Sequence, residues 1–257
     1  MKNFFKYFGI SAILIFSFYY TERINDVVIT NSDLFNEIKS ISSEYVIAPI
    51  NATIDGAYII PGVMGKSVDV FDSYYNMKDF QFFNETYLSY INVPPEVSIS
   101  NNKDKIIKKG NSHKRNIAII LKDNQKLIDY SYSKDIKFSR LVSINTYDNN
   151  YNYEQINNET EYFNKLEILL NKKHNTNICV IDNNESICRD NKKYLVESTI
   201  KLNNYNISEI KSYVDNGSII YVNDDVSLAD YKVLLSQINY NDLQMVWLST
   251  LINEERD

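Results

Sequence analysis

The sequence predicts an α/β fold, a partial or distorted β/α barrel. Short apolar runs of the kind that form strands buried on both faces recur after residue 115, and amphipathic helical patterns separate them. Alternation of strand, helix and strand implies parallel pairing through right-handed crossovers. A doubly wound sheet is the alternative that these patterns leave open. The expected strands are 116–121, 138–145, 177–181, 218–222 and 244–248, and the expected helices are 162–170, 208–214 and 227–238.

The N-terminal segment predicts a membrane anchor. Lys2 and Lys6 flank the start of an aromatic and aliphatic run over residues 7–20, which ends at the polar Thr21. The run is brief for a span of about 20 residues, but no small-x-small cleavage site follows it. We therefore favour an uncleaved transmembrane helix over a cleaved signal peptide in residues 1–23, in a single-pass protein of the cell membrane. The lysines would lie inside and the main domain outside.

Residues 24–112 predict a juxtamembrane helix followed by a small β-rich unit. Apolar residues recur at helical spacing between 31 and 45, behind Ser32 as a candidate cap. Short β-branched runs follow and are broken at a tight turn over 61–65. The remainder, residues 113–257, is the predicted main domain. A short helix is expected at 74–78 and a strand at 86–92.

Charge and cysteine content exclude two classes of function. The net charge of −6 argues against a nucleic-acid partner, because binding a polyanion requires a surplus of lysine and arginine. The two cysteines, Cys179 and Cys188, are too few for a structural zinc site, which uses four ligands. They form either a disulfide across a short loop or two buried thiols, and the sequence leaves both open.

Polar residues follow the predicted strands and mark the candidate site. Asp123, Asp148, Asp224 and Asp225 would gather at the carboxyl ends of parallel strands, where α/β folds place their chemistry. Carboxylate oxygens hold Mg²⁺ or Ca²⁺ in other proteins. We favour the plainer interpretation that these aspartates form loops and cap the helices that follow.

Three segments resemble the NodB-type polysaccharide deacetylases. They are YIIPGVMGKSVDV at 58–70, followed by SYYNMK, then IAIILKDN at 117–124, and finally GSIIYVND at 217–224 together with MVWLSTLINEE at 245–255. The resemblance implies a membrane-anchored deacetylase-like protein. In active members one aspartate and two histidines hold zinc or another divalent metal, a second aspartate is the base and a late histidine is the acid.

This chain departs from the pattern at every position of that site. Asp123 stands alone where the family has two adjacent aspartates, the segment from Asn145 to Asp148 lacks the histidine pair, and Asn223 occupies the place of the late histidine. The chain's histidines, His113 and His174, lie in lysine-rich stretches typical of the surface. We therefore expect no metal and no other cofactor.

The resemblance leaves candidate positions rather than a complete site. Asp123, Asp148 and Asn223 occupy catalytic positions, and Asn145, Tyr147 and Asp224 are candidates for binding. Tyrosines 147, 151 and 153, clustered with asparagines, are predicted to be exposed and available to a glycan. Trp247 lies in an apolar strand and is predicted to belong to the core.

The sequence supports three hypotheses of function. The first is a catalytically inactive, extracytoplasmic deacetylase-like protein that binds a cell-envelope polysaccharide or helps to assemble it. The second is an active deacetylase or other hydrolase with a rearranged acidic metal site around Asp123, Asp148 and Asp224. The third is a structural surface protein that binds no glycan.

Overall fold

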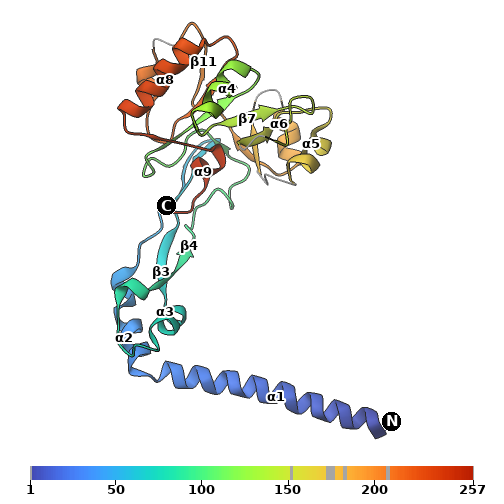
Figure 1. Ribbon diagram of the computed structural model, residues 1–257, viewed down its shortest axis with the longest axis vertical. Coiled ribbons are helices and arrows are strands. Elements are labelled where there is room, and N and C mark those ends of the chain that lie inside the picture. The colour runs from blue at the N-terminus through green and yellow to red at the C-terminus, as the bar shows by residue number, and fades with distance from the viewer. Residues whose placement is uncertain (1, 151–152, 172–176, 182–183, 207–208, 257) are drawn as a thin grey trace. The chain divides into compact units, whose positions relative to one another are not determined.

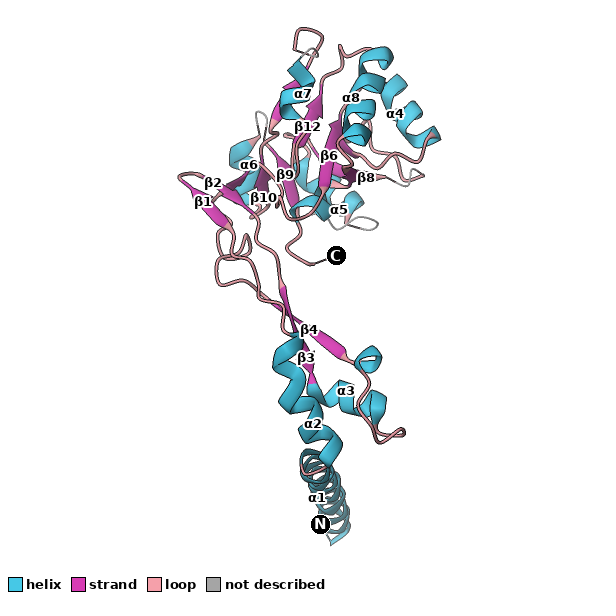
Figure 2. Ribbon diagram, turned by 90° about the vertical axis from the view of Figure 1, so that its left-hand side faces the viewer, coloured by secondary structure: helices cyan, strands magenta, loops and turns pink. Residues whose placement is uncertain are grey.

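The computed structural model describes residues 2–150, 153–171, 177–181, 184–206 and 209–256. The chain forms two compact units that alternate in sequence (Figures 1 and 2). The first comprises Met1–Ala48 and Gly65–Val93, and the second comprises Pro49–Met64 and Pro94–Asp257. The β-rich segment predicted within residues 24–112 is thus shared between the two units.

The first unit contains three helices and a two-stranded antiparallel sheet among its described residues. Ser32 caps the second helix as predicted, since its hydroxyl accepts the N–H of Phe35 at 3.3 Å. A small core forms where Leu34 and Ile38 meet Val68 and Met77. The helices are α1 (Lys2–Thr30), α2 (Asp33–Ile41) and α3 (Val70–Met77), with 3₁₀ turns at Ser42–Tyr45 and Glu85–Tyr87, and the antiparallel strands are β3 (Gly65–Asp69) and β4 (Ser89–Val93).

The N-terminal helix α1 exposes apolar side chains over most of its length. Phe8, Ile15, Phe16 and Tyr20 are each more than half exposed. Within the residues that the structure describes, no helix reaches the length and hydropathy that a membrane crossing requires. The predicted transmembrane helix is therefore not supported.

The second unit contains two sheets. One has the order β11-β12-β6-β7-β8 with β13 beside β6, and all its pairs are parallel. The other has the order β1-β2-β5-β10-β9 and is parallel except between β1 and β2. The strands are β1 (Thr53–Asp55), β2 (Tyr58–Ile60), β5 (Ile106–Ile107), β6 (Asn116–Leu121), β7 (Ser139–Val142), β8 (Glu154–Asn157), β9 (Ile178–Val180), β10 (Tyr194–Val196), β11 (Ile200–Leu202), β12 (Ile219–Val222) and β13 (Gln244–Val246).

The two sheets enclose one apolar interior. Ile120 of β6 and Ile156 of β8, in the first sheet, share a buried cluster with Val180 of β9 and Val196 of β10, in the second. Side chains alternate between the faces of a strand, so these residues define the inner face. The predicted α/β fold is confirmed, with two largely parallel sheets around this interior.

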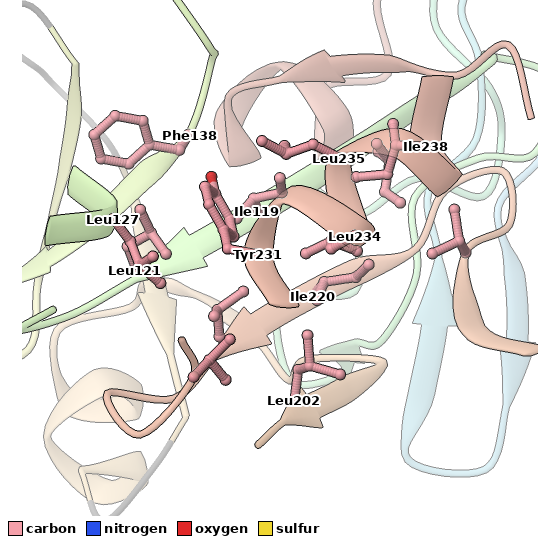
Figure 3. Packing of buried hydrophobic residues seen from close by; sticks show 14 of the residues in the cluster. Ile119, Leu121, Leu127, Phe138, Leu202, Ile220, Tyr231, Leu234, Leu235 and Ile238 are labelled. Atoms are coloured by element: carbon pink, nitrogen blue, oxygen red, sulfur yellow. The ribbon is translucent and has the colours of Figure 1, made fainter. Parts of the chain in front are cut away.

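Most helices of this unit cover the outer faces of the strands, whereas α9 packs Leu248, Leu251 and Ile252 into the inner cluster. In Figure 3, Tyr231 and Leu234 of α8 point toward Ile119 of β6 and Ile220 of β12. Tyr231 is fully buried, its hydroxyl lies 2.8 Å from that of Ser131, and burial raises its pKa to about 12. The helices are α4 (Gln125–Ser133), α5 (Phe163–Leu170), α6 (Glu185–Asp190), α7 (Ile210–Tyr213), α8 (Leu228–Tyr240) and α9 (Leu248–Ile252).

The two cysteines form a disulfide. Cys179 of β9 and Cys188 of α6 are bonded and fully buried, and they pack with Phe163 and Leu195. The disulfide alternative is thus the one that the structure adopts. It joins α6 to the outer face of the second sheet.

Candidate functional site

The candidate site lies at the carboxyl ends of β6 and β12. These strands are parallel neighbours, so the segments that follow them meet at one edge of the sheet. There the carboxylate of Asp224 accepts a hydrogen bond of 3.1 Å from the backbone N–H of Asp123. The side chain of Asn124 donates to the backbone carbonyls of Asp224 (3.0 Å) and Val226 (3.1 Å). The structure thus brings Asp123 and Asp224 together and fastens one loop to the other.

Asp148 is held by another set of contacts, in the loop between β7 and β8. Its backbone N–H donates to the side chain of Gln155 at 3.1 Å, and its carbonyl accepts from the same amide at 2.6 Å. Its carboxylate accepts the N–H of Asn150 at 2.7 Å, which closes a local turn. The hydrogen bonds of Asp148 with the described residues therefore stay within its own loop and the adjoining strand β8.

Two binding candidates occupy this same loop. Asn145 is exposed, as a ligand-contacting residue must be. Tyr147 is half-buried, and its hydroxyl donates to the carbonyl of Leu169 at 3.4 Å while its ring packs on the cluster beneath α5. Tyr147 thus secures the loop to α5.

Asn223 contributes through its backbone. Its N–H donates to the carbonyl of Leu202 at 2.9 Å, and its own carbonyl accepts from Val226 at 3.2 Å. These bonds extend the pairing of β12 with β11 and turn the chain toward α8. Its amide side chain is half-buried at the edge where Asp224 meets Asp123.

The residues present do not fit a metal of the kind that a deacetylase uses. Within the described ranges, no group of three or more histidine, cysteine, aspartate or glutamate side chains is placed to hold an ion. The carboxylates of Asp224 and Asp148 are each engaged with a backbone N–H. His113 lines a surface pocket with Arg115 and Asp242, beside the start of β6, and His174 lies outside the described residues.

Two predictions about aromatic residues are wrong. Tyr153 is only 2% exposed, because its hydroxyl accepts from the guanidinium of Arg140 at 2.7 Å and its ring packs against Phe138. Trp247 lies between β13 and α9 as a half-buried residue that lines a pocket and is not part of the core. Tyr151 lies outside the described residues. Arg140 interrupts the apolar residues of the segment 138–142. This charged residue was the one signal in the sequence for a buried polar partner such as Tyr153.

The fold was compared with proteins of known structure. The wild-type protein BA3943 of Bacillus anthracis, a CE4 family pseudoenzyme, matches with a TM-score of 0.55 and 17% identity over 87% of this chain and 96% of its own. The chain has the fold of a CE4 family pseudoenzyme. The resemblance to the NodB-type polysaccharide deacetylases is thus confirmed at the level of the fold.

Two further matches define how far the likeness extends. A BA3943 mutant with restored enzymatic activity matches with a TM-score of 0.55 and 17% identity, over 87% of this chain and 99% of that one. The uncharacterized protein YlxY of Bacillus subtilis strain 168 is 33% identical over 96 residues, which are 37% of this chain and 30% of YlxY. The match thus covers less than a third of that relative's length. No protein-family model matches the sequence.

Proposed function

We propose that the protein is a catalytically inactive member of the deacetylase-like fold that binds a cell-envelope polysaccharide. The observation that carries the proposal is the use of Asp224, whose carboxylate accepts the backbone N–H of Asp123. A loop-fastening bond occupies the place where an active member of the family would arrange metal chemistry. The sequence lacks the histidine pair in residues 145–148 and has Asn223 in place of the late histidine. These differences and the fold shared with a CE4 family pseudoenzyme support the same proposal.

The chemical argument concerns the leaving group and the nucleophile. Amide hydrolysis at neutral pH needs an activated water and a proton for the departing amine. Asn223, at the position of the late acid, has a neutral amide that cannot give up a proton under these conditions. A protein with these side chains keeps the scaffold that can hold a sugar polymer. It lacks the groups that hydrolyse the amide bond between the sugar and its acetyl group.

Measurements of acetate release and of bound metal distinguish an inactive protein from an active hydrolase with a rearranged acidic metal site. We expect the purified protein to release no acetate from acetylated cell-wall polysaccharide above the blank, with or without added Zn²⁺. Stoichiometric divalent metal that disappears in Asp123→Ala would establish the rearranged acidic site instead. Asp190→Ala is a matched control, because Asp190 is exposed and lies on α6, away from the β6 and β12 loops.

We propose in addition that the protein is anchored to the cell membrane through α1, with the second unit outside. The exposed apolar side chains of α1 and the lysines at positions 2 and 6 support this location. The Cys179–Cys188 disulfide supports an oxidising compartment, because disulfides persist outside the cytosol. Fractionation tests it: the protein should stay with the membranes through an alkaline carbonate wash, and release by that wash would contradict anchoring.

A further inference from the structure

A pocket lies beside the amino ends of β7 and β8, and its lining includes none of the candidate site residues. Lys137 and Phe138 lead from α4 into β7, and such helix-to-strand loops lie at the amino ends of the strands. Together with Tyr132, Tyr153 and Trp247 they line a pocket of about 290 Å³. Ligand pockets run from about 300 to 1,000 Å³, so this one suits a single ring and not a folded chain.

Trp247 gives the pocket an aromatic wall with an unused donor. It is half-buried, and within the described part of the chain no acceptor bonds its indole N–H. The indole N–H at the wall of the pocket is therefore available to donate to a ligand oxygen. The ammonium of Lys137 lies 5.5 Å from the centre of the indole ring and brings further donors to the rim.

The opposite wall is held rigid from behind. Arg140 is buried, and its guanidinium donates to the hydroxyl of Tyr153 at 2.7 Å. The ring of Tyr153 packs at 4.9 Å from that of Phe138. A wall fixed in this way loses little conformational entropy when a ligand binds, which is the advantage of a preorganised site.

We propose that this pocket binds one pyranose ring of a glycan, at a subsite separate from the β6 and β12 edge. A pyranose has a C–H face that packs on aromatic rings and hydroxyl groups that need donors and acceptors at the edge. Trp247 and Tyr132 offer the aromatic surface, and the indole N–H, Lys137 and Asp135 offer the polar groups. The inference rests on the proposed glycan-binding function, and it places part of that binding at a specific pocket.

The intrinsic fluorescence of the protein tests this directly, because Trp247 is the only tryptophan in the sequence. The probes are the β-1,4-linked tetramers of N-acetylglucosamine and of glucose, titrated into the full chain. We expect at least one of them to shift or quench the tryptophan emission in a saturable way. An unchanged emission with both tetramers would overturn the proposal.

Variants at exposed residues test whether the sugar binds in the pocket or elsewhere on the surface. Tyr132→Ala keeps the tryptophan reporter and should weaken binding about three- to tenfold, as expected for the loss of one aromatic contact. Lys137→Met should weaken it in the same direction. Tyr240→Ala, at an exposed tyrosine outside the pocket, is the matched control and should bind as the wild type does. Equal affinity in all three variants would overturn the proposal.

Failure of this inference is distinguishable from failure of the proposed function. Suppose that Tyr132→Ala, Lys137→Met and the wild type all sediment equally with cell-wall polysaccharide. This result would support glycan binding and would show that the pocket does not contribute to it. A tetramer that quenches Trp247 in a protein that does not sediment with the polymer would support the pocket and contradict polymer binding.

Discussion

The carboxylate of Asp224 accepts the backbone N–H of Asp123 across the ends of two neighbouring parallel strands, at 3.1 Å. This single bond places both acidic candidates at one edge while using one of them to fasten a loop. The contact therefore favours a structural role for Asp224.

Removal of the Asp224 carboxylate should cost stability and nothing else. We expect Asp224→Ala to lower the free energy of unfolding by up to about 1 kcal/mol, the usual net value of one partly exposed hydrogen bond. Urea unfolding measures the effect, with Asp190→Ala as the surface control. A loss of bound metal or of acetyl-releasing activity on this substitution would contradict the structural role.

Gln155 should position the loop that carries Asn145 and Asp148. Its amide both donates to and accepts from the backbone of Asp148, and it is fully buried. Gln155→Glu keeps the shape and the acceptor but loses the donor, so we expect a loss of about 1–3 kcal/mol of unfolding free energy. Hydrogen exchange of the Asp148 amide should accelerate in this variant, and unchanged exchange would show that the side chain does not hold the loop.

Glu154 should make stability depend on pH in the acidic range. Its carboxylate is buried at the start of β8 and accepts the N–H groups of Leu248 (2.9 Å) and Ser249 (3.2 Å), as well as the hydroxyl of Ser139. Burial raises its pKa and outweighs these hydrogen bonds, which lower it.

The sign of the pH effect follows from the raised pKa. The folded state holds the proton of Glu154 more tightly than the unfolded state does, so the contribution to stability is full below the unfolded pKa of about 4.3 and is lost as pH rises through the folded value. We expect Glu154→Gln to be less stable overall, because its amide N–H₂ faces other donors. The stability difference between wild type and variant should shrink as pH rises above 4.3, and a difference that grows would contradict the raised pKa.

The disulfide should contribute measurably to the second unit. Cys179 and Cys188 are nine residues apart, and closing so short a loop stabilises a fold by about 2 kcal/mol. Replacing both cysteines with alanine should lower the melting temperature. Adding reductant to the wild type should lower it by a similar amount. The double variant itself should not respond to reductant, and a response would show that the reductant acts elsewhere.

The sequence predicts the longer apolar strands and misses β8, β10 and β11. The run 116–121 coincides with β6, because its five apolar residues are buried on both faces of the strand, as is Asn116 at its start. The strand β8 (Glu154–Asn157) has three polar residues of four, and no hydrophobic pattern marks it. It is buried because each polar side chain finds a partner distant in sequence or in the adjoining loop, as Gln155 does with Asp148.

The sequence predicts where the candidate site lies in the fold. It does not predict which contacts its side chains make. The alternation of strands and helices places Asp123 and Asp224 at one edge, and the structure brings them together. The turn that engages Asp148 depends on side-chain contacts with Gln155 and Asn150, which no spacing rule shows. The exposure of Trp247 depends on where β13 ends, and strand boundaries are the least certain part of a sequence pattern.

The measurement that tests the account most directly is sedimentation of the full chain with insoluble cell-wall polysaccharide in the presence of a metal chelator. If the protein binds glycan without metal chemistry, the bound fraction should be saturable and the same with chelator, without it, and with added Zn²⁺. A bound fraction that the chelator abolishes and Zn²⁺ restores, or no binding under any of these conditions, would contradict the account.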